Sequence, residues 1–331
     1  MVTRRTFLRA STAAALYPLF SGCDQSPPWE RDAYRKSHSS RVAILGASSY
    51  EKSLKDTISR GIKLFQLDLK GKVVLLKPNL VEFDPNGVIN TNPLVVEAAI
   101  DSFKTFGARE VIVAEGPGHR RDNEYLLRAS GIYDVIKEHA VRYVDLNSDD
   151  VRPRRLHSRF TTLQQLYLPE TLFNVDLLVS MPKLKTHHWA GVTLSLKNMF
   201  GVVPGTVYGW PKNVLHWAGI ENSILDINSS LPVPQFAIID GIVGMEGNGP
   251  LQGQAKNSGV LILGNDLVAV DATAARLMKI EPRKVKYLEM AGDFLGNLAY
   301  DKIEQLGENL EKLQQDFRVI ENFQDLKILT G

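Results

Sequence analysis

The strongest constraint on the fold of this 331-residue chain is the alternation of short, largely apolar β-rich segments with helical segments from residue 41 onward. Apolar strands that lack an exposed polar face are typical of a mainly parallel sheet covered by helices on both faces. We therefore predict an α/β domain over residues 41–331. The expected strands are 42–45, 73–76, 111–114, 142–144, 175–180, 236–239 and 260–263, and the expected helices are 54–65, 93–106, 126–139 with a break at Gly131, and 267–278.

One region departs from this alternation. Residues 182–230 are rich in Lys, His, Trp and Gly, and their apolar residues follow no single period. We interpret the region as an irregular Lys/His/Gly-rich insertion into the α/β domain, with helices expected over 191–200 and 214–227.

The first 22 residues have the pattern of a twin-arginine signal peptide. Arg4 and Arg5 precede an apolar pair, and residues 10–20 contain no charge. A basic segment before a short apolar run is an export signal, and the run is too short for a bilayer core of about 30 Å. We therefore expect export through the twin-arginine translocation machinery. The alternative is an ordinary first helix of the domain.

Cys23 follows two small residues, Ser21 and Gly22, as in a bacterial lipobox, although Phe20 stands where leucine is usual. We expect a lipid on Cys23 to anchor the protein at the periplasmic or outer face of the plasma membrane, with residues 23–40 as a flexible tether. Simple cleavage by signal peptidase is the alternative. Because Cys23 is the only cysteine, an intramolecular disulfide and a Cys-ligated iron–sulfur cluster are both excluded.

The charge balance argues against nucleic acid as a partner. The formal net charge is +2, and loss of the three arginines of the signal leaves 2 − 3 = −1. Nucleic-acid binding needs an excess of basic residues that neutralise phosphates. We expect a small anionic ligand or substrate instead.

Ionisable and amide side chains follow several expected strands. In an open parallel sheet, ligands bind beyond the carboxyl ends of the strands, so these side chains should meet in one site. We assign His187, Lys183 and Lys77 to catalysis, with His187 as base or ligand, and Lys185, Lys197, Asn79 and Asn198 to substrate binding. Glu115 follows the strand at 111–114 and lies in the same group.

Three carboxylates suggest a divalent cation. Asp240 and Glu246 flank an expected Gly-rich loop, and Asp271 lies near a helix start, so all three could offer oxygen ligands to Mg²⁺ or Ca²⁺. For Asp271, a carboxylate at a helix N-terminus is an equal alternative. Metal binding by His187, His188 and His216 is a further alternative that no ligand spacing supports.

The central block resembles a known family. Residues 182–187 (PKLKTH), 193–201 (TLSLKNMFG) and 204–205 (PG) resemble the signature of the bacterial and archaeal family catalogued as domain of unknown function 362. Residues 77–79, 240–241 and 268–271 resemble its flanking blocks in the same order. The resemblance implies no settled activity. Some members carry ferredoxin-like iron–sulfur modules, which this chain cannot form without further cysteines.

These patterns favour an exported enzyme, assisted by a metal or another cofactor, that acts on a small anionic substrate. They do not distinguish an oxidoreductase from an isomerase. The alternative is a non-catalytic periplasmic lipoprotein that binds an anionic ligand or cofactor. The two differ in whether an acid–base group lies within reach of the bound anion.

Overall fold

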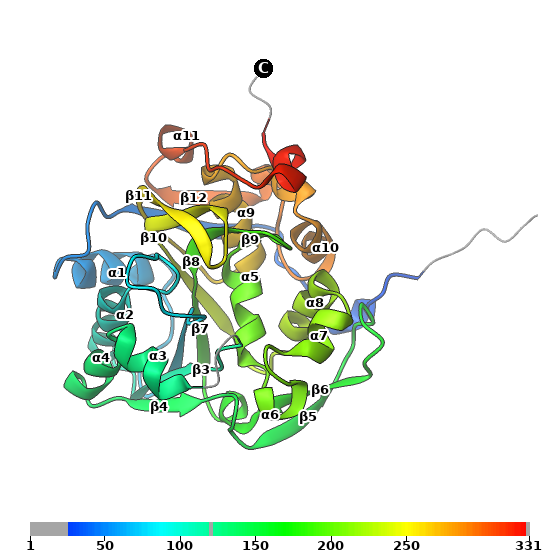
Figure 1. Cartoon of the computed structure of the whole chain (residues 1–331), viewed down its shortest axis with the longest axis horizontal. Helices are drawn as coiled ribbons and strands as arrows, with labels where there is room; N and C mark the ends of the chain where they lie inside the picture. Colours follow the sequence, from blue (N-terminus) through cyan, green and yellow to red (C-terminus); the bar gives the residue numbers. More distant parts are fainter. Residues whose placement is uncertain (1–25, 119–121, 329–331) are drawn as a thin grey trace, which may run out of the picture.

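Strand β1 (Ser40–Gly46) lies between two hydrophobic cores, since Val42 and Ile44 pack into one core and Ala43 and Leu45 into the other. A strand buried on both faces belongs to a sheet covered on two sides. The computed structural model describes residues 26–118 and 122–328, and in these residues β1 is part of a ten-stranded sheet (Figure 1).

The sheet has the order β12-β1-β11-β10-β7-β2-β3-β4, and β8 pairs with β10 and with β9. A separate pair of strands, β5 and β6, forms a small antiparallel ribbon. The strands span Ser40–Gly46 (β1), Val73–Pro78 (β2), Glu110–Glu115 (β3), Arg142–Asp145 (β4), Val151–Arg155 (β5), Gln165–Pro169 (β6), Leu177–Met181 (β7), Lys183–His187 (β8), Gly191–Thr193 (β9), Gln235–Asn248 (β10), Gln252–Gly264 (β11) and Ile303–Gly307 (β12).

Most neighbouring strands of the large sheet are parallel. The antiparallel pairs in the described residues are β1 with β11, β10 with β11, and β8 with β9. The other neighbours, which include the central strands β10, β7, β2 and β3, run parallel. The predicted fold class, α/β with a mainly parallel sheet, is confirmed.

Helices cover both faces of the sheet, as predicted (Figure 1). Ile58, Ile62 and Phe103, from α1 and α2, belong to one core, whereas residues of α5, α8, α9 and α10 contribute to the other. The α-helices span Leu54–Lys63 (α1), Pro93–Thr105 (α2), Asn123–Ala129 (α3), Ile132–Glu138 (α4), Ser195–Asn198 (α5), Gly205–Tyr208 (α6), Asn213–Trp217 (α7), Ile220–Ser230 (α8), Leu267–Leu277 (α9), Lys286–Phe294 (α10) and Leu310–Leu313 (α11).

The prediction of a Gly-rich loop after residue 239 is wrong. This segment is the continuation of β10. It forms a long hairpin with β11 whose register shifts between Gly241 and Val243. A Cβ atom on Gly244 would lie 2.7 Å from the carbonyl oxygen of Leu184. The glycine therefore allows close approach of β10 to β8, which a loop interpretation missed.

The insertion at 182–230 is also more regular than predicted. The helix expected over 191–200 is instead strand β9, helix α5 and a 3₁₀ turn over Met199–Val202. The helix expected over 214–227 is divided into α7 and α8 at Gly219, whose φ of 97° lies in a region that L residues rarely adopt. Helix α5 brings Lys197 to the edge of the sheet, and helix α7 brings His216 there.

The described part of the segment expected to be a flexible tether, residues 26–40, is mostly exposed, but Trp29 and Tyr34 pack against the hydrophobic core. The ring of Trp29 stacks on Phe294 with centroids 4.8 Å apart, and Trp29 also forms a β-bridge with Ser158. Burial of aromatic area holds the segment against the domain at Trp29. The signal peptide and Cys23 lie outside the described residues.

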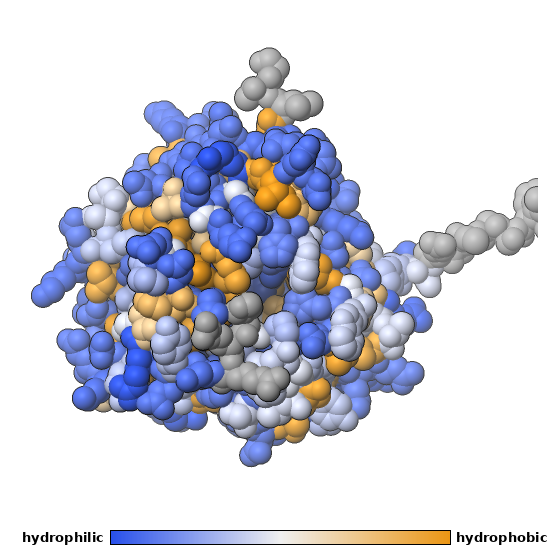
Figure 2. All heavy atoms as spheres, in the orientation of Figure 1, coloured by the Kyte–Doolittle hydropathy of each residue, from blue (hydrophilic) through white to orange (hydrophobic). Residues whose placement is uncertain are grey.

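The face shown in Figure 2 is mainly hydrophilic, and its hydrophobic residues lie in separate groups. Exposed aromatic residues include Trp189 and Trp217, which are 58% and 80% exposed. Among the described residues, no helix combines the length and apolar character needed to cross a bilayer.

Candidate functional site

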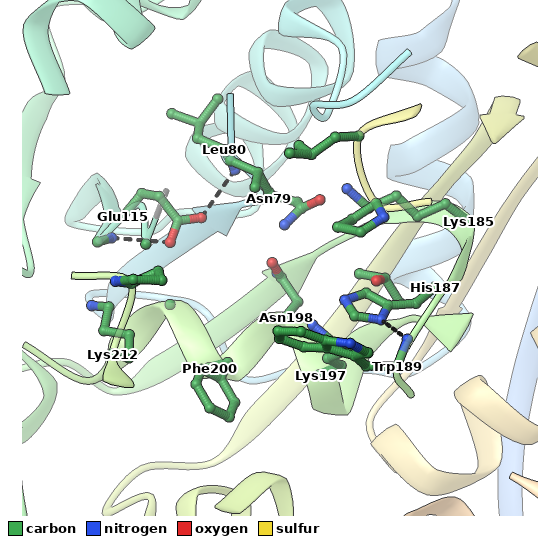
Figure 3. Close-up of a pocket in the computed structure, with 18 of the residues that line it drawn as sticks. Asn79, Leu80, Glu115, Lys185, His187, Trp189, Lys197, Asn198, Phe200 and Lys212 are labelled. Carbon is green, nitrogen blue, oxygen red and sulfur yellow. Dashed lines mark hydrogen bonds between the residues drawn. The ribbon is translucent and has the colours of Figure 1, made fainter. Parts of the chain in front are cut away.

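A cavity of about 300 Å³ lies beyond the carboxyl ends of β2, β3 and β8, as expected for an open α/β sheet (Figure 3). Helix α5 and the segment before α7 close one side, and Pro250 and Leu251 at the tip of the β10–β11 hairpin reach its edge. The polar and ionisable side chains that line it are Lys77, Asn79, Glu115, Lys185, His187, His188, Thr193, Lys197, Asn198, Lys212 and His216.

Lys77 and Glu115 form a buried ion pair at the ends of the adjacent parallel strands β2 and β3. The Nζ atom of Lys77 lies 2.6 Å from Oε2 of Glu115 and 3.1 Å from Oδ1 of Asn198. Glu115 also accepts hydrogen bonds from the backbone N–H groups of Leu80 and Gly116. Both charges are therefore compensated, and this pair forms the floor of the cavity rather than a free acid or base.

Lys185 on β8 is buried like Lys77 but has no carboxylate partner among the described residues. Its Nζ atom donates one hydrogen bond, of 2.9 Å, to the carbonyl oxygen of Ile89. Burial, and then the positive charges of Lys197 and Lys183, hold the pKa of Lys185 well below its usual range. Lys185 therefore presents an amine to the cavity with little to stabilise its charged form.

Two further lysines add to the positive character of the cavity. The Nζ atom of Lys197 on α5 has no hydrogen bond within the described part of the chain and lies 6.0 Å from the centroid of the Phe200 ring. Burial, and then Lys77, lower the pKa of Lys197 to about 8. Burial likewise lowers the pKa of Lys212 to about 7. Lys212 donates hydrogen bonds to Asn147 and to the carbonyl oxygen of Val203.

His187 faces the cavity in a defined tautomer. Its Nδ1 atom accepts hydrogen bonds from the backbone N–H groups of Trp189, at 3.0 Å, and Ala190, at 3.2 Å. An N–H group only donates, so Nδ1 is unprotonated and the ring proton is on Nε2. Burial, and then the charge of Lys197, lower the pKa of His187. His187 therefore acts as a neutral hydrogen-bond donor, which does not fit the predicted role of base.

His188 and His216 have the opposite tautomer. Nδ1 of His188 lies 2.7 Å from the carbonyl oxygen of Gly249, and Nδ1 of His216 lies 3.1 Å from that of Lys212. A carbonyl oxygen only accepts, so Nδ1 carries the proton and the Nε2 lone pair is free when the ring is neutral. Both rings flank Trp189. They are therefore the candidate bases of this cavity.

Two buried oxygen atoms on residues that line the cavity have no hydrogen-bond partner in the part of the chain that the structure describes. They are Oδ1 of Asn79 and Oγ1 of Thr193, whose residues are 7% and 3% exposed. Buried polar groups are almost always paired, so both atoms are suited to contact a ligand. In Figure 3 the side chains of Asn79, Lys185, His187 and Asn198 converge on the same space.

The structure separates Lys183 from this group. Its Nζ atom lies 2.6 Å from Oδ2 of Asp240 and 2.9 Å from the hydroxyl oxygen of Tyr50. Asp240 also accepts hydrogen bonds from Tyr50 and from the backbone N–H of Asn92. Lys183 and Asp240 thus form a second satisfied ion pair, in a neighbouring depression lined by Tyr50 and Thr91.

The three carboxylates proposed to bind a cation are not brought together. Glu246 accepts hydrogen bonds from the side chain and the backbone N–H of Arg318. Asp271 accepts from the backbone N–H groups of Ser195 and Leu196, at 2.7 and 2.9 Å. These bonds satisfy the first N–H groups of α5. Asp271 lies inside its own helix α9, whose N-cap is Asp266, so the alternative of a carboxylate at the N-terminus of its own helix is wrong.

Only one group of side chains in the described residues has the close spacing of metal ligands. It consists of Glu97, Glu138 and His139, near the surface, with ligand atoms within 4.8 Å of one another. This group includes neither the three carboxylates nor the histidines of the cavity. The geometry therefore offers no support for a metal at either predicted place.

Sequence reasoning placed Lys77, Asn79, Lys185, His187, Lys197 and Asn198 together in one site, and the structure brings all six to the cavity. It missed Lys212 and Trp189, and it did not select His188. The signal for His188 was its adjacency to His187. Because adjacent strand residues alternate in direction, that adjacency seemed to exclude a shared site, but His188 lies just beyond the end of β8, where its ring stacks on that of His187 at 5.0 Å.

Comparison with known proteins gives a family and a distant relative. The sequence model of a family described as "Domain of unknown function (DUF362)" matches residues 74–276. A protein of Synechocystis sp. named "Thylakoid-associated protein" is 27% identical over 229 residues, which cover 65% of this chain and 65% of that protein. The chain therefore spans less than two thirds of the length of this curated relative.

Two solved structures resemble the fold at low identity. The lactate racemase apoprotein from Thermoanaerobacterium thermosaccharolyticum has a TM-score of 0.41 and 13% identity, and the match covers 67% of this chain and 54% of that one. A protein from Thermotoga maritima has a TM-score of 0.38 and 13% identity, with 70% and 60% covered. These values describe a distant likeness in fold and nothing more.

Proposed function

This chain belongs to the family described as "Domain of unknown function (DUF362)", a description that names no activity, and we propose its function from the cavity. We propose that the protein binds a small organic anion in the cavity and acts on it as an enzyme. One observation carries the proposal. Lys185 and Lys197 line the cavity, and neither has a carboxylate partner among the described residues. A bound anion would supply the counter-charge that both amines lack, and together with a buried donor such as His187 Nε2–H they fit a carboxylate or phosphate group.

Free acid–base groups favour an enzyme over a binding protein. The Nε2 atoms of His188 and His216 are unprotonated in the neutral rings, and both residues line the cavity. A base that faces a bound anion is what a catalyst needs and a carrier does not. His188 or His216 takes the role of base that we predicted for His187. Lys185 takes the place in the cavity that we predicted for Lys183.

A ligand screen tests the anion site. Small carboxylates and phosphates are added to the purified protein, and thermal stability is measured. A ligand at 100 times its dissociation constant stabilises the folded protein by about 2.7 kcal/mol. Lys197→Met should abolish the stabilisation, because it removes a cation from the cavity. Lys63→Met, an exposed lysine on α1, is the matched control and should bind normally.

Two results would contradict the anion site. One is the absence of stabilisation by any carboxylate or phosphate in a folded protein. The other is equal stabilisation of the Lys197→Met variant, which would place binding elsewhere. To separate enzyme from carrier, the best ligand is incubated with the protein and its conversion is followed by NMR. Conversion that is lost in His188→Gln or His216→Gln supports the enzyme, and unchanged ligand supports the binding protein.

Export and anchoring belong to the same proposal. The support is the sequence of residues 1–23, together with the name of the Synechocystis relative, which describes that protein as thylakoid-associated. We expect the Arg4→Lys/Arg5→Lys variant to stay in the cytoplasm of a host with the twin-arginine pathway. Cys23→Ala should be exported but should lose lipid labelling and leave the membrane fraction. A labelled Cys23→Ala protein would contradict the anchor.

A further inference from the structure

Three lysines at the edge of the sheet, Lys77, Lys183 and Lys185, are buried to 0–2% exposure, but their partners differ. Lys77 and Lys183 each have a carboxylate oxygen 2.6 Å from Nζ. Lys185, two residues after Lys183 on β8, has only the carbonyl oxygen of Ile89 as a hydrogen-bond acceptor in the described residues. The fold therefore compensates two of the three ammonium groups and leaves the third without a counter-charge.

An ammonium group without a counter-charge is expensive to bury, so an amine in this position is neutral for much of the time. Its lone pair then makes it a nucleophile, and amines of this kind add to carbonyl groups to form Schiff bases. The hydrogen bond to Ile89 uses one N–H of Lys185 and leaves the lone pair free. The lowered pKa of Lys185 agrees with this geometry.

The groups around Lys185 fit a ligand that carries a carbonyl next to a carboxylate. Lys197 supplies a nearby positive charge for the carboxylate, and its charge is a cause of the lowered pKa of Lys185. His187 Nε2–H is a neutral donor in the same cavity. Asn79, with its unpartnered Oδ1, lies on the opposite side of the space into which Lys185 points (Figure 3).

We propose that Lys185 forms an imine with the carbonyl carbon of a small 2-oxo acid bound in this cavity. The Nζ lone pair attacks the carbonyl carbon, a proton passes from nitrogen to oxygen, and the resulting carbinolamine loses water to give the C=N bond. One amine and one carbonyl give one imine and one water, with no oxidant or reductant. This proposal rests on the proposed anion site and names its substrate class.

Borohydride trapping tests the imine directly. The purified protein is incubated with pyruvate or glyoxylate, treated with sodium borohydride, and analysed by intact mass and by peptide mapping. We expect one reduced adduct per chain, located on Lys185. Exposed lysines are protonated near neutral pH, Lys197 with a pKa of about 8 is mostly protonated there as well, and Nζ of Lys212 is held by hydrogen bonds to Asn147 and Val203. Lys185→Met and Lys185→Arg should lose the adduct, and Lys63→Met should keep it.

The outcomes separate this inference from the proposed function. Adducts spread over exposed lysines, or an adduct that persists in Lys185→Met, would overturn the imine. Binding of lactate, a 2-hydroxy acid without a carbonyl, is measured in parallel by calorimetry. If lactate binds in a Lys197-dependent way but no adduct forms on Lys185, the anion site stands and the imine fails. If no oxo acid, no lactate and no other carboxylate or phosphate binds, both fail. Mapping on the wild-type chain makes the result independent of how the variants fold.

Discussion

The Nζ atom of Lys77 lies 2.6 Å from Oε2 of Glu115, and each side chain is only 1% exposed. The pair joins the carboxyl ends of two neighbouring parallel strands and forms the floor of the cavity. Its charges cancel in a place where solvent does not reach, so the lysines of the cavity that lack a carboxylate partner among the described residues are Lys185, Lys197 and Lys212. The pair therefore supports the site without acting in it.

Replacement of Glu115 by Gln should destabilise the protein strongly. The change leaves the buried ammonium of Lys77 without a counter-charge, and breaking one partner of such a pair typically costs about 3–5 kcal/mol. Denaturant unfolding measures the loss. Glu110→Gln, on the same strand, is the matched control: its pair with Arg142 is exposed and should contribute less than about 1 kcal/mol. Similar losses for both variants would contradict the buried role of Glu115.

Gly201→Ala should disturb the same floor by overpacking. A Cβ atom at Gly201 would lie 2.1 Å from Oε1 of Glu115 and 2.7 Å from Nζ of Lys77. Forced displacement of packed groups typically costs about 1–3 kcal/mol. We expect lower stability in chemical denaturation and weaker anion binding in calorimetry. Gly46→Ala, where the nearest atom is 3.7 Å away, should be neutral, and an unaffected Gly201→Ala protein would disprove the close packing.

The fold could be predicted from the sequence because its main signal is local. Apolar strands such as 73–76 and 111–114 alternate with helices, and both faces of the sheet are covered as that pattern requires. The β10–β11 hairpin was missed for an equally physical reason. Gly244 and Gly247 look like loop residues in isolation, whereas Gly244 is required by the nearby Leu184 carbonyl, which only the tertiary structure shows.

The site was predictable only as far as strand ends determine it. Lys77 and Lys185 were placed correctly because the carboxyl ends of strands meet at one edge. The ion pairing and the protonation of each side chain were not predictable, because they depend on partners that lie far away in the sequence. Lys183 is neutralised by Asp240, and Nδ1 of His187 is occupied by backbone N–H groups, and neither contact follows from spacing. The predicted cation site of Asp240, Glu246 and Asp271 was wrong for the same reason, since each carboxylate has protein partners that the sequence does not show.

The stability of the protein should rise with pH between about 8 and 10. The folded protein holds the pKa of Lys212 at about 7 and that of Lys197 at about 8, against 10.5 for an ordinary lysine. In this range the unfolded chain binds more protons than the folded one, so unfolding becomes less favourable as pH increases. Each such lysine contributes on the order of 1 kcal/mol per pH unit.

Urea unfolding at several pH values measures this slope. Lys212→Met should flatten it, since the variant removes one titrating group, while Asn147 keeps its hydrogen bond from Gly205. Lys63→Met, on the surface of α1, should leave the slope unchanged. A flat profile in the wild-type protein, or an unchanged slope in Lys212→Met, would show that these amines are not held neutral.

His187 should remain neutral, with its proton on Nε2, from pH 5 to pH 8. The two backbone N–H groups that point at Nδ1 oppose protonation there, and burial together with the nearby Lys197 lowers the pKa of the ring. The ¹⁵N chemical shifts of the ring distinguish the two tautomers and the imidazolium form, and His187→Gln assigns the signals. His139, which is partly buried beside Glu97 and Asp101, is the internal comparison. A His187 ring that carries its proton on Nδ1, or that becomes an imidazolium above pH 5, would restore it as the base and remove the case for His188 and His216.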